Sequence, residues 1–142
     1  MLHCLEGEEE LINWNDYPNF TQHEFSCKGL DCCGGRSDMD AEFMNALQSM
    51  RTALGFPLPI TSGYRCEAHN IAVNGGIPHP TGKAADIQIS GDRAFKLLHL
   101  AGNLMTGIGL LQHGIHAGRF IHLDMLDSEG GKVARPTIWS YG

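Results

Sequence analysis

The spacing of the predicted strands limits the folds that this chain can adopt more than any single motif does. Apolar patterning and turn residues predict four short strands, at residues 58–62, 84–89, 107–111 and 120–125. Amphipathic stretches predict three helices, at residues 38–54, 67–73 and 92–101. Helices and strands interleave, but the strands follow one another too closely for repeated parallel crossovers. We therefore expect an α+β fold, with a small, mostly antiparallel sheet and helices packed on one face.

The helix at residues 38–54 has the clearest pattern. Its apolar residues recur every three or four positions and so form one stripe. They are Met39, Phe43, Leu47, Met50 and Leu54. Asp38 is placed to cap the first turn of this helix, and Gly55 is placed to end the last. We expect the stripe to belong to the core.

Length and charge narrow the possible functions. We expect a single domain over residues 1–142, with residues 1–18 as a less certain N-terminal segment. The net charge of −6 argues against a nucleic-acid partner. No apolar run approaches the roughly 18 residues of a membrane helix, so we expect no membrane partner. The first residues lack the basic and apolar regions of a secretion signal, and the acidic run at residues 6–10 is expected to be solvated.

Three polar residues stand where the hydrophobic pattern would not place them. Asp86 lies on the polar face of the strand at 84–89, and His122 faces away from the apolar residues of the last strand. His79 lies in a loop rich in glycine and proline. Two imidazoles and one carboxylate are the typical protein ligands of a catalytic zinc ion, with a fourth position left for water. These three residues are therefore the candidate metal ligands.

Cysteine is the other unusual residue, because the chain has five. Cys27, Cys32 and Cys33 lie in one loop, while Cys4 and Cys66 lie apart in the sequence. An odd count leaves at least one thiol unpaired within the chain. Reduced thiols, a disulfide and a small metal site remain open, since side-chain separations decide between them.

Several short blocks of the sequence occur together in the order of a known family. They are residues 62–66 (SGYRC), 69–70 (HN), 74–76 (NGG), 79–87 (HPTGKAADI), 107–109 (GIG) and 120–124 (FIHLD). With these blocks the chain resembles the M15 zinc peptidases over residues 19–141. That family includes D-alanyl-D-alanine carboxypeptidases and peptidoglycan endopeptidases, some of them phage lysis enzymes, and it has the Hedgehog/DD-peptidase-like fold.

The resemblance assigns roles to the candidate residues. It places His79, Asp86 and His122 at the three zinc-ligand positions, and it implies one catalytic Zn²⁺ ion. Arg65 takes the place of the arginine that binds the carboxylate of the substrate, a role that suits its planar guanidinium. Ser62, in the same block, is a second candidate for substrate binding.

The catalytic base is less well defined by the resemblance. Several relatives carry an acid where this chain has Arg119, and a guanidinium cannot act as a base at neutral pH. His116 stands where other branches have a glutamate, and an imidazole suits the role. Asp124 is the rival, although it could instead orient a zinc ligand. His113 is the third candidate.

The sequence thus predicts a monomeric zinc metallopeptidase that hydrolyses peptide bonds in the stem peptides of bacterial peptidoglycan. The alternative is a non-catalytic zinc-binding module, as in Hedgehog-type domains, that docks on the cell wall or on a protein partner. A phage lysis enzyme or a virion component would reach the wall without a secretion signal of its own.

Overall fold

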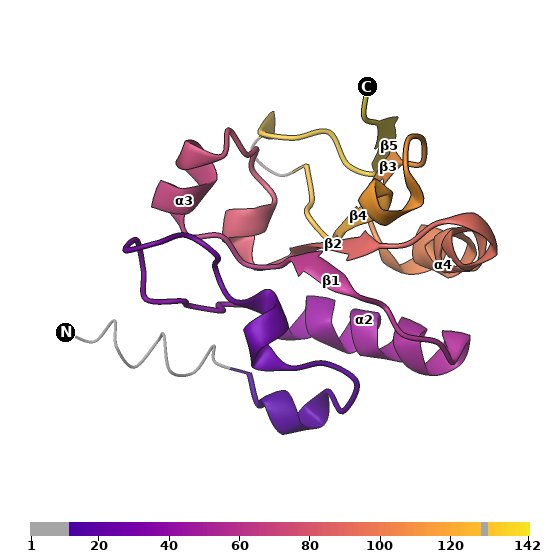
Figure 1. Cartoon of the computed structure of the whole chain (residues 1–142), viewed down its shortest axis with the longest axis horizontal. Helices are drawn as coiled ribbons and strands as arrows, with labels where there is room; N and C mark the ends of the chain where they lie inside the picture. Colours follow the sequence, from indigo (N-terminus) through magenta and orange to yellow (C-terminus); the bar gives the residue numbers. More distant parts are fainter. Residues whose placement is uncertain (1–11, 129–130) are drawn as a thin grey trace.

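A five-stranded sheet runs through the part of the chain that the computed structural model describes, residues 12–128 and 131–142 (Figure 1). The strands are β1 (Ile60–Ser62), β2 (Ala84–Gln88), β3 (Gly107–Leu111), β4 (Phe120–Asp124) and β5 (Thr137–Ser140). The helices are α2 (Ala41–Leu54), α3 (Glu67–Ala72) and α4 (Gly91–Leu104). Short 3-10 turns are η1 (Trp14–Asp16), η2 (Gln22–Phe25), η3 (His79–Thr81) and η4 (His116–Gly118). The acidic run at residues 6–10 lies outside the described residues.

The strand order across the sheet is β1-β2-β4-β3-β5. Three neighbouring pairs are antiparallel, and the pair of β3 with β5 is parallel. The predicted α+β class with a mostly antiparallel sheet is therefore confirmed. The strand β5 was not predicted, because it is a four-residue edge strand whose residues are only half-buried or exposed.

One face of the sheet packs on the helices and forms the core. Ile87 of β2 and Ile121 and Leu123 of β4 belong to the same buried cluster as the apolar sides of α2 and α4. These two helices also contact each other. The opposite face of β2 and β4 carries Asp86 and His122, so the sheet separates the core from the polar residues of the candidate site.

Several element boundaries differ from the predictions; α4, for example, extends three residues past its predicted end, to Leu104. Asp40, rather than Asp38, caps α2, since its carboxylate accepts a hydrogen bond from the backbone N–H of Phe43 at 3.0 Å. Asp38 instead forms an ion pair with Arg36. The strand β1 is shorter than predicted, and the carbonyl of Pro59 before it accepts a bond from the N–H of Gln88. Gly55 ends α2 in the left-handed conformation, as predicted.

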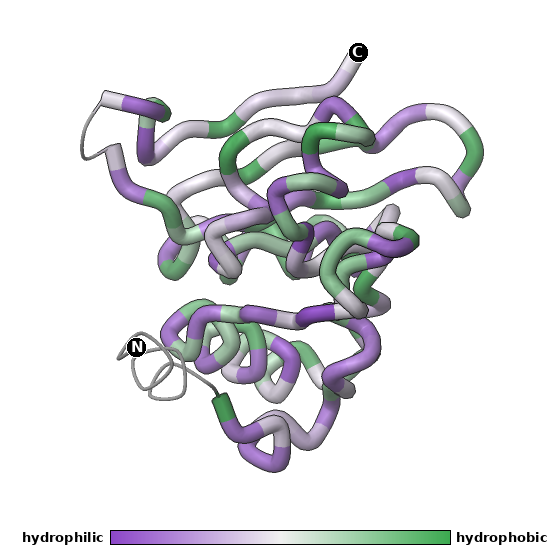
Figure 2. The backbone as a smooth tube through the Cα atoms, turned by 90° about the vertical axis from the view of Figure 1, so that its left-hand side faces the viewer, coloured by the Kyte–Doolittle hydropathy of each residue, from purple (hydrophilic) through white to green (hydrophobic). Residues whose placement is uncertain are grey.

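Hydrophobic residues are dispersed along the chain (Figure 2). The tube shows only short hydrophobic segments, with hydrophilic ones between them. Within the described residues, we find no helix with the length and apolar character needed to cross a membrane.

Candidate metal centre

Asp86 and His122 are direct cross-strand partners on the polar face of the sheet. Ser62 lies beside Asp86 on β1, and Gly109 lies on the other side of His122 on β3. Trp139 of β5 completes this row across the five strands. A Cβ atom on Gly109 would come within 2.6 Å of the Trp139 indole, so glycine leaves room for the ring. The indole in turn packs against His122, with ring centroids 5.3 Å apart.

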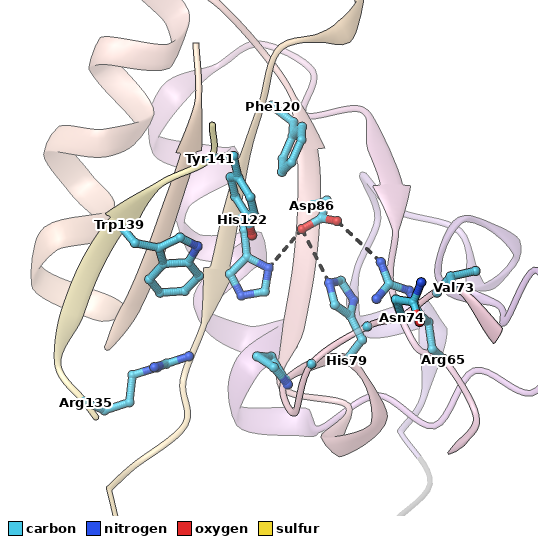
Figure 3. A pocket seen from close by; sticks show the side chains of 13 residues that line it. Arg65, Val73, Asn74, His79, Asp86, Phe120, His122, Arg135, Trp139 and Tyr141 are labelled. Carbon is cyan, nitrogen blue, oxygen red and sulfur yellow. Dashed lines mark hydrogen bonds and ion pairs between the residues drawn. The ribbon is translucent and has the colours of Figure 1, made fainter. Parts of the chain in front are cut away.

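Nitrogen atoms of two imidazoles converge on one carboxylate oxygen of Asp86 (Figure 3). The Nδ1 atom of His122 lies 2.9 Å from Oδ1 of Asp86, and the Nε2 atom of His79 lies 3.4 Å from the same oxygen. His79 comes from the turn η3, which precedes β2. The three ligand atoms lie within 4.8 Å of one another, so they could hold one metal ion. A set of two imidazoles and one carboxylate suits Zn²⁺.

The second nitrogen of each imidazole is held by the protein. Nδ1 of His79 lies 2.7 Å from the carbonyl oxygen of Gly63, which can only accept a hydrogen bond. Nε2 of His122 lies 2.8 Å from Oδ2 of Asp124. Without a metal, the other two nitrogens, Nε2 of His79 and Nδ1 of His122, face Oδ1 of Asp86 and can donate to it. On metal binding these two nitrogens would lose their protons and offer lone pairs to the ion. Such supporting hydrogen bonds are usual around metal-binding histidines.

The electrostatics of the site favour a charged carboxylate between the rings. Burial alone would raise the pKa of Asp86, but hydrogen bonds from His122 and His79 outweigh it and hold the pKa well below its usual range. Burial alone would lower the pKa of His122, but the carboxylates of Asp124 and Asp86 raise it above its usual value. Asp86 therefore carries a negative charge at neutral pH, which suits a metal ligand.

Asp124 is buried and lies behind His122 rather than in the open pocket. Its two oxygens accept bonds from Nε and Nη2 of Arg135, at 2.8 and 2.7 Å, in a forked ion pair. Burial opposes ionisation of Asp124, but His122 and Arg135 lower its pKa to about 2. Of the two roles considered for Asp124, this geometry supports the orienting one.

Arg135 is a residue that sequence reasoning missed. It lies eleven positions after its partner Asp124, in a segment for which the sequence predicted no regular element. The residue pattern carried no signal for it, since only the return of this segment to the sheet brings the guanidinium to the carboxylate.

A pocket opens over the three convergent residues. Its lining comprises Arg65, Val73, Asn74, Gly75, Gly76, Pro78, His79, Asp86, Phe120, His122, Arg135, Trp139 and Tyr141. Nη2 of Arg65 lies 3.8 Å from Oδ2 of Asp86, and its Nη1 donates to the side chain of Asn70 at 3.2 Å. The structure thus brings Arg65 to the edge of the candidate centre.

The remaining predicted residues lie elsewhere. His116 is exposed in η4, with Nδ1 3.3 Å from the hydroxyl of Ser90, and it lines a separate hollow beside Gln88. His113 is exposed, with Nε2 3.4 Å from the carbonyl of Tyr141. Neither histidine is among the described residues that line the pocket, and neither is Ser62. Their assigned roles stay predictions.

Comparison with known proteins gives the family of the chain. The model of the family described as Peptidase M15 matches residues 18–124. This match contains all three convergent side chains together with Arg65. A search of the curated proteins found no match. Since the family match spans well over half of the sequence, the chain belongs to the peptidase M15 family.

Proposed function

We propose that this protein is a zinc-dependent peptidase that cleaves the stem peptides of bacterial peptidoglycan. The proposal rests on one observation, the convergence of two imidazole nitrogens on a carboxylate oxygen at the floor of a pocket. In this proposal His79, Asp86 and His122 hold the ion. Zinc bound there would supply an activated water molecule and polarise the scissile carbonyl.

The protein's own residues would bind and orient the substrate. Arg65 has its guanidinium at the edge of the pocket, where two parallel N–H groups can bind a peptide carboxylate. The bond from Nη1 to Asn70 limits the orientations that the arginine can take. Asn70 is itself fixed by a bond to the carbonyl of Gly76, at 2.8 Å. The substrate carboxylate would thus meet a preorganised partner.

The proton shuttle is proposed to be His116, on the ground of the resemblance described above. Tyr141 offers a second polar group, because it lines the pocket and burial raises the pKa of its phenol. A protonated phenol can donate a hydrogen bond to the developing oxyanion. Replacing the shuttle should lower kcat by about 10²- to 10⁴-fold, so His116→Ala should show this loss and exposed His99→Ala should not. Tyr141→Phe tests the contact with the oxyanion separately.

A second candidate function is a zinc-binding module without catalysis. Asp86 is the only carboxylate among the described residues that line the pocket, and it is already committed as a ligand. Arg119 stands where several relatives have an acid, and it donates two bonds to the carbonyl of Gly114. Because the described pocket lining offers no second carboxylate that could act as a base, this feature favours the non-catalytic module.

One experiment separates the two functions. Purified peptidoglycan is incubated with the protein, and the products are identified by mass analysis and by the appearance of new amines. We expect fragments whose masses name the bond that is cut, loss of activity on chelation, and recovery with zinc. His79→Ala should be inactive, while His99→Ala should behave like the parent protein. Retained activity in His79→Ala, in a protein without zinc, would refute the mechanism, and wall binding without fragments would establish the module.

The site of action follows from the proposed substrate. Peptidoglycan lies outside the bacterial cytoplasm, so we propose that the protein works at the cell wall. Release during phage lysis or transport in a virion would bring it there. Detection of the protein in purified virions, or only in lysates after lysis, would distinguish these two routes.

A further inference from the structure

Four cysteines meet in a cluster that the peptidase mechanism does not use. Cys27, Cys32 and Cys33 come from the loop after η2, and Cys66 comes from the residue that precedes α3. Their sulfur atoms all lie within 4.8 Å of one another. Cys27 and Cys66 are buried, and the other two are half-buried. None of the four lines the pocket over His79 and Asp86.

The distances between the sulfurs match those around a single tetrahedral ion. A zinc–sulfur bond is about 2.3 Å, so two thiolates on one tetrahedral ion lie about 3.8 Å apart. The Sγ atoms of Cys27 and Cys32 are 3.7 Å apart, and those of Cys32 and Cys33 are 3.9 Å apart. A disulfide would need a separation of about 2.0 Å. All four cysteines are free thiols in the structure.

The surrounding backbone is shaped to bring the thiols together. The N–H of Cys27 donates to the carbonyl of Arg36 at 2.7 Å, which closes the cysteine loop at its base. A Cβ atom on Gly29 would come within 2.6 Å of Sγ of Cys32 and 2.8 Å of the ring of His69. Glycine is therefore required where the loop passes over the sulfur.

Two backbone groups donate to the sulfurs themselves. The N–H of Cys66 lies 3.4 Å from Sγ of Cys27, and the N–H of His69 lies 3.5 Å from Sγ of Cys66. Hydrogen bonds of this kind stabilise thiolates and support metal-bound sulfur. A ring of four thiolates without an ion would place like charges in contact, whereas a divalent cation would neutralise half of their charge.

We propose that Cys27, Cys32, Cys33 and Cys66 bind a second, structural zinc ion. Four sulfur ligands leave no open position for water, which is the mark of a structural rather than a catalytic site. The ion would tie the cysteine loop to Cys66, directly after Arg65. The same strip of chain carries Gly63, whose carbonyl holds His79. The second ion would therefore brace one side of the pocket without taking part in the reaction.

Metal content and cobalt spectroscopy test this site independently of peptidase activity. The parent protein should bind about two zinc ions per chain, and Cys32→Ser/Cys33→Ser about one. Cobalt in the parent protein and in His79→Ala should give intense thiolate-to-metal charge-transfer absorption, which the double cysteine variant lacks. Cys4→Ser, which changes the one cysteine outside the described residues, is the matched control and should keep both ions.

A second measurement keeps all four cluster cysteines in place, so it does not depend on whether the double cysteine variant folds. In the Cys4→Ser background, a mercurial reagent should release about one zinc ion as the four cluster thiols react. Thiols that react without releasing zinc, a disulfide among the four under reducing purification, or iron in place of zinc would overturn the proposal. A protein that keeps the cobalt–thiolate absorption but cleaves no peptidoglycan would refute the proposed peptidase function and would leave the structural zinc site supported.

Discussion

The Nε2 atom of His122 lies 2.8 Å from Oδ2 of Asp124, a carboxylate that is fully buried behind it. The other ring nitrogen of His122 points to Asp86. The imidazole of His122 thus links Asp86, which lines the pocket, to the buried carboxylate of Asp124. In the proposed zinc site, this relationship would make the metal affinity depend on a carboxylate that is not exposed to the pocket.

Asp124→Asn should weaken zinc binding at the proposed site of His79, Asp86 and His122 by about 10- to 100-fold. The amide removes the negative charge that holds His122 with Nε2 as the donor. Affinity is measured by competition with a chromogenic chelator, and circular dichroism shows whether the variant is folded. Asp92→Asn, at an exposed carboxylate on α4, is the control and should bind zinc like the parent. Unchanged affinity in folded Asp124→Asn would contradict the orienting role.

Arg135→Met should destabilise the protein by about 3–5 kcal/mol, because it leaves the carboxylate of Asp124 buried without its forked partner. Urea unfolding measures the change. Arg93→Met removes an exposed arginine that lies over the ring of Phe56, and it should cost about 1 kcal/mol or less. If the two variants lose equal stability, Arg135 does not compensate the buried charge.

Gly107→Ala should destabilise the protein by about 1–3 kcal/mol. A Cβ atom at this position would come within 2.3 Å of Oδ1 of Asp124, so the carboxylate would have to move away from His122. Gly102 on α4 has no atom within 4 Å of its added Cβ. Gly102→Ala should therefore stabilise the helix by about 0.5–1 kcal/mol. Urea unfolding measures the change in stability for both variants. A loss for Gly107→Ala together with a gain for Gly102→Ala would show that the cost at residue 107 comes from the contact with Asp124.

The metal-free protein should be most stable between about pH 4 and 6.5. The pKa of Asp124 is about 2 in the folded state, so its contribution is present above pH 4 and is lost as the pH falls toward 2. The pKa of His122 is raised, so its contribution is present below about 6.5 and is lost as the pH rises through the folded value.

Urea unfolding of chelator-treated protein at several pH values tests this stability profile. In Asp124→Asn the loss of stability between about pH 4 and 2 should become smaller, because the titrating carboxyl is gone. An identical acid profile in the parent and the variant would show that other groups set the acid limit.

Much of the fold could be predicted, because the apolar residues that define each helix and strand lie close together along the sequence. Strand β3 begins and ends where predicted, and β4 differs by one residue. Period-two alternation also placed Asp86 and His122 on the polar faces of their strands, and the structure pairs them. His79 carries no periodic signal, so its residue type and its place in a loop just before β2 joined it to the other two, and the resemblance then assigned it a ligand position.

What the sequence did not predict depends on chain segments that meet only in the folded protein. The parallel strand β5 and the Asp124–Arg135 pair both require the chain after residue 124 to return to the sheet. The cysteine cluster needs Cys66 to approach a loop more than thirty residues earlier, as its contact with Cys27 shows. Spacing along the sequence does not encode such approaches.

Arg65→Gln should lower kcat/KM for a peptide with a free terminal carboxylate by about ten- to hundredfold. The same substitution should barely change kcat/KM for the matching peptide amide, since the amide has no charge for the guanidinium to bind. Steady-state cleavage of both peptides by parent and variant gives the four rates. Arg51→Gln on α2 serves as the control, because Arg51 is not among the residues that line the pocket.

The four rates from the Arg65→Gln experiment also identify which part of the substrate the arginine binds. A loss confined to the free acid places the terminal carboxylate at Arg65, beside Oδ2 of Asp86, and makes the protein a carboxypeptidase. An equal loss for acid and amide would mean that Arg65 binds the substrate elsewhere, as an endopeptidase could require. Equal rates in parent and variant would remove Arg65 from substrate binding altogether, leaving it with its contacts to Asn70 and Asp86 in the pocket wall.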